Sequence, residues 1–130
     1  MSPEFDYSRT RFALALKLLT AGDPSLLRGP DTLPGRLRTA VQEVHSCTRK
    51  HFARNRDYLG FTGLMNALRA RSPTASVLDA IPVLSADECT RFVSRLMILA
   101  QSVVAALALI RLRGAWLSAQ LDCNVVMHCA

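Results

Sequence analysis

The chain has 130 residues, half of them hydrophobic, and a formal net charge of +6. This length suffices for one domain with one core, and the hydrophobic content argues against a disordered chain. The four cysteines form no CxxC pair, and the acidic N-terminus lacks an apolar run. We therefore expect reduced thiols and a cytoplasmic protein without a signal peptide.

The positive charge is concentrated in residues 36–71. This segment holds eight basic residues against Glu43 and Asp57, which accounts for the whole net charge. Such a segment can attract RNA or an acidic protein, although it is more commonly the solvated side of a helix. Phe52, Tyr58 and Phe61 lie near it and could stack on bases.

The first two predicted helices are separated by a loop. Ser8 is a candidate N-cap for a helix over residues 8–21, which Gly22-Asp23-Pro24 ends. Residues 22–35 hold half of the prolines and half of the glycines and are expected to form the loop. A helix over residues 34–54 follows, because apolar residues recur there at helical spacing: Leu37, Val41, Val44, Thr48 and Phe52.

A third helix is predicted over residues 56–70 and a short one over residues 74–81, which Pro82 ends. Gly60 and Gly63 weaken the third helix or let another helix approach it closely. The side chains expected to face inward from it are Leu59, Leu64, Met65 and Leu68.

The best-defined element starts at Ser85, where Ser-Ala-Asp-Glu forms a capping box with Glu88. The predicted helix continues to about Arg113 and carries no charge from residue 96 to 110. That stretch spans about 22 Å, less than the roughly 30 Å of a bilayer core. We therefore predict a central helix buried on all sides rather than a membrane span. Gly114 is expected to separate it from a short last helix with Trp116, Leu117 and Leu121.

Together these elements predict an all-α fold. One helical domain covers residues 1–130, with loosely ordered ends at residues 1–7 and 123–130. Five to six amphipathic helices surround the central hydrophobic helix.

This architecture resembles the Bcl-2 family of apoptosis regulators. The death motif of that family places a leucine, a hydrophobic residue four positions later and a small residue directly before Gly-Asp. Those positions are filled here by Leu14, Leu18, Ala21, Gly22 and Asp23. Ile110, Gly114 and Trp116 match the second homology region loosely. Because the Asn-Trp-Gly-Arg motif is absent and Pro24 follows Asp23 directly, the chain looks most like the short poxvirus-type members.

The resemblance implies a non-enzymatic regulator, most readily an inhibitor, of apoptosis or innate immune signalling. It would sequester a helical peptide or a signalling protein in a groove between the second, third and central helices. The implied contact residues are Phe52, Leu59, Phe61, Met65 and Leu68, with Arg54, Arg56 or Arg69 supplying a cation.

Other interpretations of the same residues remain open. A core helix with a glycine stop explains Leu14–Asp23 more simply than a death motif does. A basic helical module that binds RNA or assembles with it is the alternative function, and a homodimeric adaptor is another.

Neither a metal site nor a catalytic site is predicted. Cys47 and His51 lie four residues apart with His45 nearby, but this spacing is not diagnostic of zinc, even with Cys123, His128 and Cys129 added. The sequence has no GxSxG, phosphate-loop or HExxH motif. We therefore expect no cofactor and no enzymatic activity.

Overall fold

The computed structural model describes residues 2–20 and 24–129, with side chains described as far as residue 121. Within these ranges the chain forms helices, short 3-10 turns and loops without a β-strand, which confirms the all-α prediction. Turns lie at Pro24–Leu26, Arg49–His51 and Ile81–Val83. The α-helices are α1 (Pro3–Thr20), α2 (Leu33–Val44), α3 (Asn55–Arg71), α4 (Val77–Ala80) and α5 (Ala86–Cys129).

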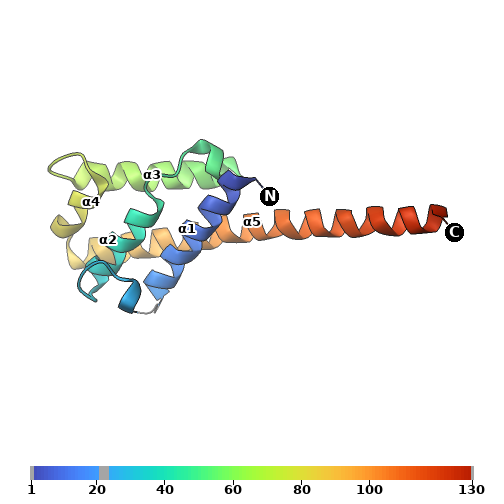
Figure 1. Ribbon diagram of the computed structural model, residues 1–130. Coiled ribbons are helices and arrows are strands. Elements are labelled where there is room, and N and C mark those ends of the chain that lie inside the picture. The colour runs from blue at the N-terminus through green and yellow to red at the C-terminus, as the bar shows by residue number, and fades with distance from the viewer. Residues whose placement is uncertain (1, 21–23, 130) are drawn as a thin grey trace.

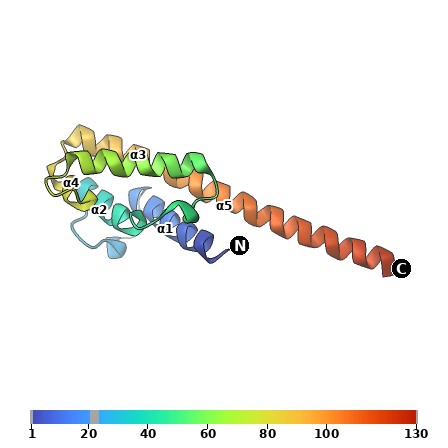
Figure 2. The same cartoon turned by 90° about the horizontal axis from the view of Figure 1, so that it is seen from above.

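A compact bundle forms around the first half of α5. Helix α5 packs against α1, α2 and α3, and α1 also packs against α2 (Figure 1). The second half of α5 projects away from the bundle in both views (Figures 1 and 2). Large, fully buried side chains from α1, α2, α3 and α5 fill the core, among them Phe12, Leu18, Leu37, Leu64, Leu68, Leu96 and Leu107.

Helix α1 starts five residues earlier than the sequence predicted. It begins at Pro3 because proline suits a first helical turn and the Ser2 hydroxyl accepts a hydrogen bond from the Phe5 amide at 3.4 Å. Ser8 is therefore not an N-cap. It is fully buried inside α1, and its hydroxyl donates to the His51 carbonyl at 2.6 Å. Residues 3–7 are helical rather than a loose end.

Helix α2 is shorter than predicted. Leu37, Val41 and Val44 are buried on one face as expected, but the helix ends at Val44. Thr48 is exposed, and its amide donates to Nδ1 of His51 at 2.8 Å across a 3-10 turn. Phe52 reaches the core from this non-helical connection. The predicted helical face therefore exists only from Leu37 to Val44.

The predicted capping box at the start of α5 is confirmed. The Ser85 hydroxyl accepts from the Glu88 amide at 3.2 Å, and the Glu88 carboxylate accepts from the Ser85 amide at 3.1 Å. Just before it, Pro82 lies inside the 3-10 turn that follows α4 rather than ending a helix over residues 74–81.

Ser85→Ala should lower the free energy of unfolding by about 1 kcal/mol, because the Glu88 amide loses its acceptor at the helix end. Chemical denaturation followed by circular dichroism measures this. Ser94→Ala is the matched control, since Ser94 is exposed in the interior of α5, where alanine is the better helix former. An equal loss of stability in both variants would contradict a capping role.

The hydrogen bond from the Ser85 amide is the main cause that lowers the pKa of Glu88, with the Ser85 hydroxyl and Arg71 contributing. A lowered pKa in the folded state means that this contribution to stability is present at neutral pH. It is lost as the pH falls through the folded-state pKa.

Helix α5 is unbroken, so the predicted interruption at Gly114 is wrong. Glycine ends helices by adopting a positive φ, and none of the described glycines does so. Inside a helix a glycine costs only about 1 kcal/mol, which long flanking helical segments tolerate. The backbone of residues 123–129 continues the same helix rather than forming a loose tail.

The predicted burial of α5 on all sides is also wrong. Ile98 is 67% exposed, and Leu109, Leu112, Trp116 and Leu121 in the projecting half are 60–66% exposed. By length and composition, the segment Ala86–Leu121 is apolar enough to cross a membrane. Within its most apolar stretch of 18 residues, 39% is buried in the bundle. Helix α5 therefore leaves apolar surface uncovered.

Candidate functional site

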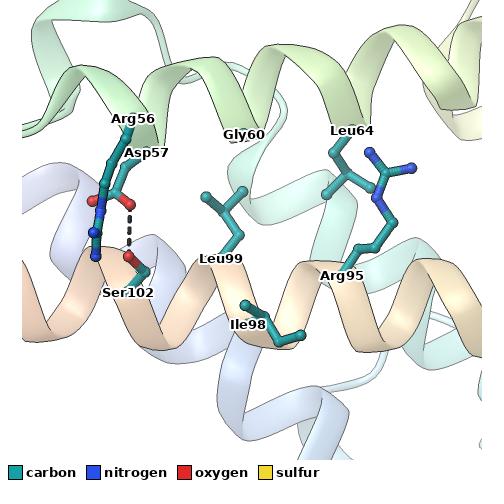
Figure 3. Close-up of a pocket in the computed structure, with 8 residues that line it drawn as sticks. All are labelled: Arg56, Asp57, Gly60, Leu64, Arg95, Ile98, Leu99 and Ser102. Carbon is teal, nitrogen blue, oxygen red and sulfur yellow. Dashed lines mark hydrogen bonds between the residues drawn. The ribbon is translucent and has the colours of Figure 1, made fainter.

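A groove lies between α3 and the first half of α5 (Figure 3). Its first cavity has a volume of about 350 Å³. Helix α3 contributes Arg56, Asp57, Gly60 and Leu64 to the lining, and α5 contributes Arg95, Ile98, Leu99 and Ser102.

The floor of this cavity is apolar. Leu99 points from α5 towards Gly60 in α3 (Figure 3), and a Cβ on Gly60 would lie 3.5 Å from a methyl group of Leu99. The missing side chain at Gly60 thus leaves a methyl end of Leu99, which is 8% exposed, at the floor of the groove between the helices. Leu64 closes the floor on the α3 side and is 2% exposed.

A buried polar network closes one end of the cavity. The Asp57 carboxylate accepts from the Ser102 hydroxyl at 2.6 Å and from Nε of Arg54 at 3.0 Å. Arg54 also donates to the Ser102 carbonyl at 2.8 Å. Because Asp57 is only 4% exposed, these bonds compensate for its lost hydration and fix α3 against α5.

A second cavity of about 330 Å³ adjoins the first and shares Arg95 with it. It is lined by Ala67, Ala70, Arg71, Glu88, Arg91, Phe92 and Arg95. The two cavities together are called the α3/α5 groove below. They lie along the same pair of helices and give the groove the elongated shape that a helix requires.

The α3/α5 groove carries uncompensated positive charge. Its acidic residue Glu88 pairs with Arg71, and Asp57 pairs with Arg54. Among the described residues, Arg56, Arg91 and Arg95 form no salt bridge, although Arg91 lies near enough to Glu88 to help lower the pKa of that carboxyl. The Arg95 guanidinium lies 5.6 Å from the centroid of the Phe92 ring, which keeps it beside the groove. An anionic group entering the groove would meet these three cations.

Four of the predicted contact residues are buried: Phe52, Phe61, Met65 and Leu68 are at most 5% exposed and pack in the core. Phe61 and Met65 also line, together with the predicted Arg69, a separate cavity of about 220 Å³. Leu59 is 59% exposed, so the expectation that it faces inward is wrong.

Of the three predicted cations, Arg56 alone lines the groove. Arg54 is committed to Asp57 and Ser102, and Arg69 donates to Asn66 at 3.1 Å beside a different hollow. Sequence reasoning missed Arg91 and Arg95. Their spacing of one helical turn, next to an apolar stretch, was the available signal.

The death-motif-like residues lie in and after α1. Leu18 is fully buried in the core and Leu14 is half-buried. Ala21, Gly22 and Asp23 lie outside the described residues. Leu18 thus faces the interior of this protein, as the simpler interpretation of the segment requires.

Several arginines of residues 36–71 hold the fold together. Arg36 bonds Asp31 at 2.7 Å and the Leu18 carbonyl at 2.8 Å. Arg49 donates to the Phe52 carbonyl at 3.1 Å and lies over the ring of Tyr58. Arg36 and Arg49 therefore contribute to the stability of the fold as well as to the positive charge of residues 36–71.

Cys47 and His51, the candidate metal ligands, lie in environments that do not form a metal site among the described residues. Burial raises the pKa of the Cys47 thiol to about 11, despite the opposing effect of Arg11, so the thiol stays protonated at neutral pH. Nδ1 of His51 accepts from the Thr48 amide. Within the described part of the chain, no three His, Cys, Asp or Glu side chains are grouped to hold a metal ion.

Comparison with known proteins gives no relative. The chain matches no protein-family model and no curated protein, and no solved structure matches it.

Proposed function

We propose that the protein is a helical interaction module that binds an acidic amphipathic helix of a partner protein in the α3/α5 groove. The observation that carries this proposal is the combination of an apolar floor with three arginines that form no salt bridge. Apolar anchors and charged groups at helical spacing are the usual basis of helix-in-groove recognition.

The bound helix would lay its apolar stripe mainly on Ile98, which is 67% exposed, and on the edges of Leu64 and Leu99 that line the cavity. Arg91 and Arg95 are one helical turn apart, about 6 Å along α5, and so suit two acidic residues spaced four apart on the partner. Arg56 would receive a further acidic group across the groove. Charge attraction speeds the encounter, whereas the buried apolar contacts supply most of the affinity.

This binding mode is the one that the resemblance to the Bcl-2 family implied, with a different set of contact residues. A role as a non-enzymatic inhibitor of apoptosis or innate immune signalling is proposed on the sequence resemblance alone. The partner would be captured by the outer surface of α3 and α5, because Phe52, Phe61, Met65 and Leu68 are occupied in the core.

Fluorescence anisotropy with a labelled helical peptide tests the proposal. The probe carries leucines on one face and two glutamates four residues apart. We expect micromolar or tighter binding, weakened at least tenfold by Arg56→Glu or Arg95→Glu, because each change replaces attraction by repulsion. Arg38→Glu is the control, since it makes the same change of charge at an exposed site in α2.

Single-stranded RNA in a salt series provides the competing ligand. The proposal fails if the peptide does not bind at 100 μM of protein, or if Arg38→Glu weakens binding as much as Arg95→Glu. RNA binding that falls steeply with salt, with no peptide binding, would instead favour the nucleic-acid alternative.

A further inference from the structure

The projecting half of α5 continues the exposed side of the groove. Ile98 lines the first cavity, and the residues that follow it at steps of seven, four, three and four share its side of the helix. All of them are exposed. We call this set the outer stripe: Ile98, Ala105, Leu109, Leu112 and Trp116.

The outer stripe is complementary to itself when two α5 helices run antiparallel. If residue 107 marks the centre, Ile98 of one copy lies level with Trp116 of the other, and Ala105 lies level with Leu109. A large side chain then meets a small one near the centre, as close helix packing requires. Arg113 lies level with Gln101, so this register brings no two arginines opposite each other.

The same register brings Trp116 of the second copy to the α3/α5 groove. Level with Ile98, its indole would meet the first cavity, whose volume of about 350 Å³ has room for it. Arg56 and Arg95 at this cavity provide guanidinium groups for the face of the indole. Tryptophan in a pocket is a typical centre of a protein interface.

We infer that the chain forms an antiparallel homodimer in which each copy's projecting α5 covers the groove of the other. The inference rests on the proposed function, because it names an occupant for the same groove. From Gly114 to Leu121 the sequence has no lysine or arginine, so the segment around Trp116 brings no positive charge to a groove rich in arginine.

The available area is sufficient for a dimer. The outer stripe runs about 27 Å from Ile98 to Trp116. Its four large side chains are 60–67% exposed, and covering them together with the groove on both copies buries roughly 1,200 Å², the lower limit for a stable interface. The symmetric arrangement also closes on itself, so it stops at two copies.

Trp116 is the single tryptophan of the chain, so its fluorescence reports directly on this contact. We expect the emission to shift to shorter wavelength as the protein concentration rises through the micromolar range, in parallel with dimer formation in sedimentation equilibrium. Ile98→Asp should abolish both changes, and Trp116→Ala should be monomeric. Leu121→Ala is the matched control, because Leu121 is similarly exposed on another side of α5 and should remain dimeric. Circular dichroism verifies that each variant is folded.

Several outcomes would overturn the dimer. They are a monomer at all concentrations, a dimer that persists in both Ile98→Asp and Trp116→Ala, or a dimer lost in Leu121→Ala. A shift of Trp116 emission that requires phosphatidylcholine–phosphatidylserine vesicles and occurs without dimerisation would identify a lipid surface as the occupant instead.

Peptide titration separates this inference from the proposed function. Trp116→Ala should bind the acidic helical peptide more tightly than the wild type, because its groove is no longer covered. Peptide binding by a wild-type monomer would leave the proposed function intact and remove the dimer. If the wild type dimerises but the monomeric Trp116→Ala variant binds no peptide, the dimer stands and the proposed function fails.

Discussion

Phe12→Ala is expected to lower the free energy of unfolding by about 3–5 kcal/mol. Phe12 is fully buried in α1, and its ring makes edge-on contacts with Phe52 and Phe61 at centroid distances of 5.7 and 6.2 Å. Truncation leaves a cavity and removes these contacts between α1, α3 and the connection before α3. Urea unfolding followed by circular dichroism measures the loss.

Two further variants make this result interpretable. If Phe12→Ala is too unstable to fold, Phe12→Leu should still fold, with a loss of about 1–2 kcal/mol from the smaller cavity. Phe5→Ala is the control on the same helix, because Phe5 is only partly buried. A loss below 1 kcal/mol for Phe12→Ala would show that the aromatic cluster does not anchor α1.

The second large effect is expected at the polar end of the groove. Asp57→Ala should cost about 2 kcal/mol, because the partly buried Ser102 hydroxyl and the Arg54 guanidinium both lose an acceptor. The loss is moderated because the Arg54 side chain is 35% exposed and can turn towards water. Asp79→Ala, which removes an exposed carboxylate that accepts from Thr74, should cost at most about 0.5 kcal/mol.

A double-mutant cycle tests whether the network acts as a unit. Asp57→Ala and Ser102→Ala should show a coupling energy above about 0.5 kcal/mol, because each removes the same hydrogen bond. Strictly additive losses would show that Asp57 and Ser102 stabilise the α3–α5 contact independently.

Local chemistry made part of the fold predictable. The capping box at Ser85 and Glu88 depends on residues three apart, so the sequence alone determines it. The bounds of α3 were predicted to within one residue, because Pro73 follows its end and the apolar residues Leu64, Met65 and Leu68 repeat at helical spacing.

The predictions failed where the structure depends on contacts between residues far apart in the sequence, which a local pattern does not show. From residue 96 to 110, α5 is apolar on every side, so periodicity does not show which side the bundle covers. Ser8 has the chemistry of an N-cap, but its hydroxyl bonds a carbonyl 43 residues away. Phe52 continues the spacing of α2 by coincidence and reaches the core from outside any helix.

The candidate groove was only partly predictable for the same reason. A helical groove formed with the third and central helices was expected, and Arg56 was among its residues. Arg91 and Arg95 were not predicted because the expected cations, Arg54, Arg56 and Arg69, all precede the central helix, which was expected to be covered on every side. Gly60 was noted for its missing side chain, and the structure shows that this opens the space above Leu99.

Because α5 is one unbroken helix, a rotation of its first half also moves its projecting half. The helix forms one wall of the groove and then runs about 40 Å from Ser102 to Cys129. A tilt of about 5° about the contact with α3 would move that end by about 3.5 Å, since a rigid rod magnifies rotation in proportion to its length. A small tilt of α5 when a ligand binds in the groove therefore displaces the projecting half of α5 far enough to be measured. A pair of distance labels, one on α1 and one on the projecting half of α5, would detect it.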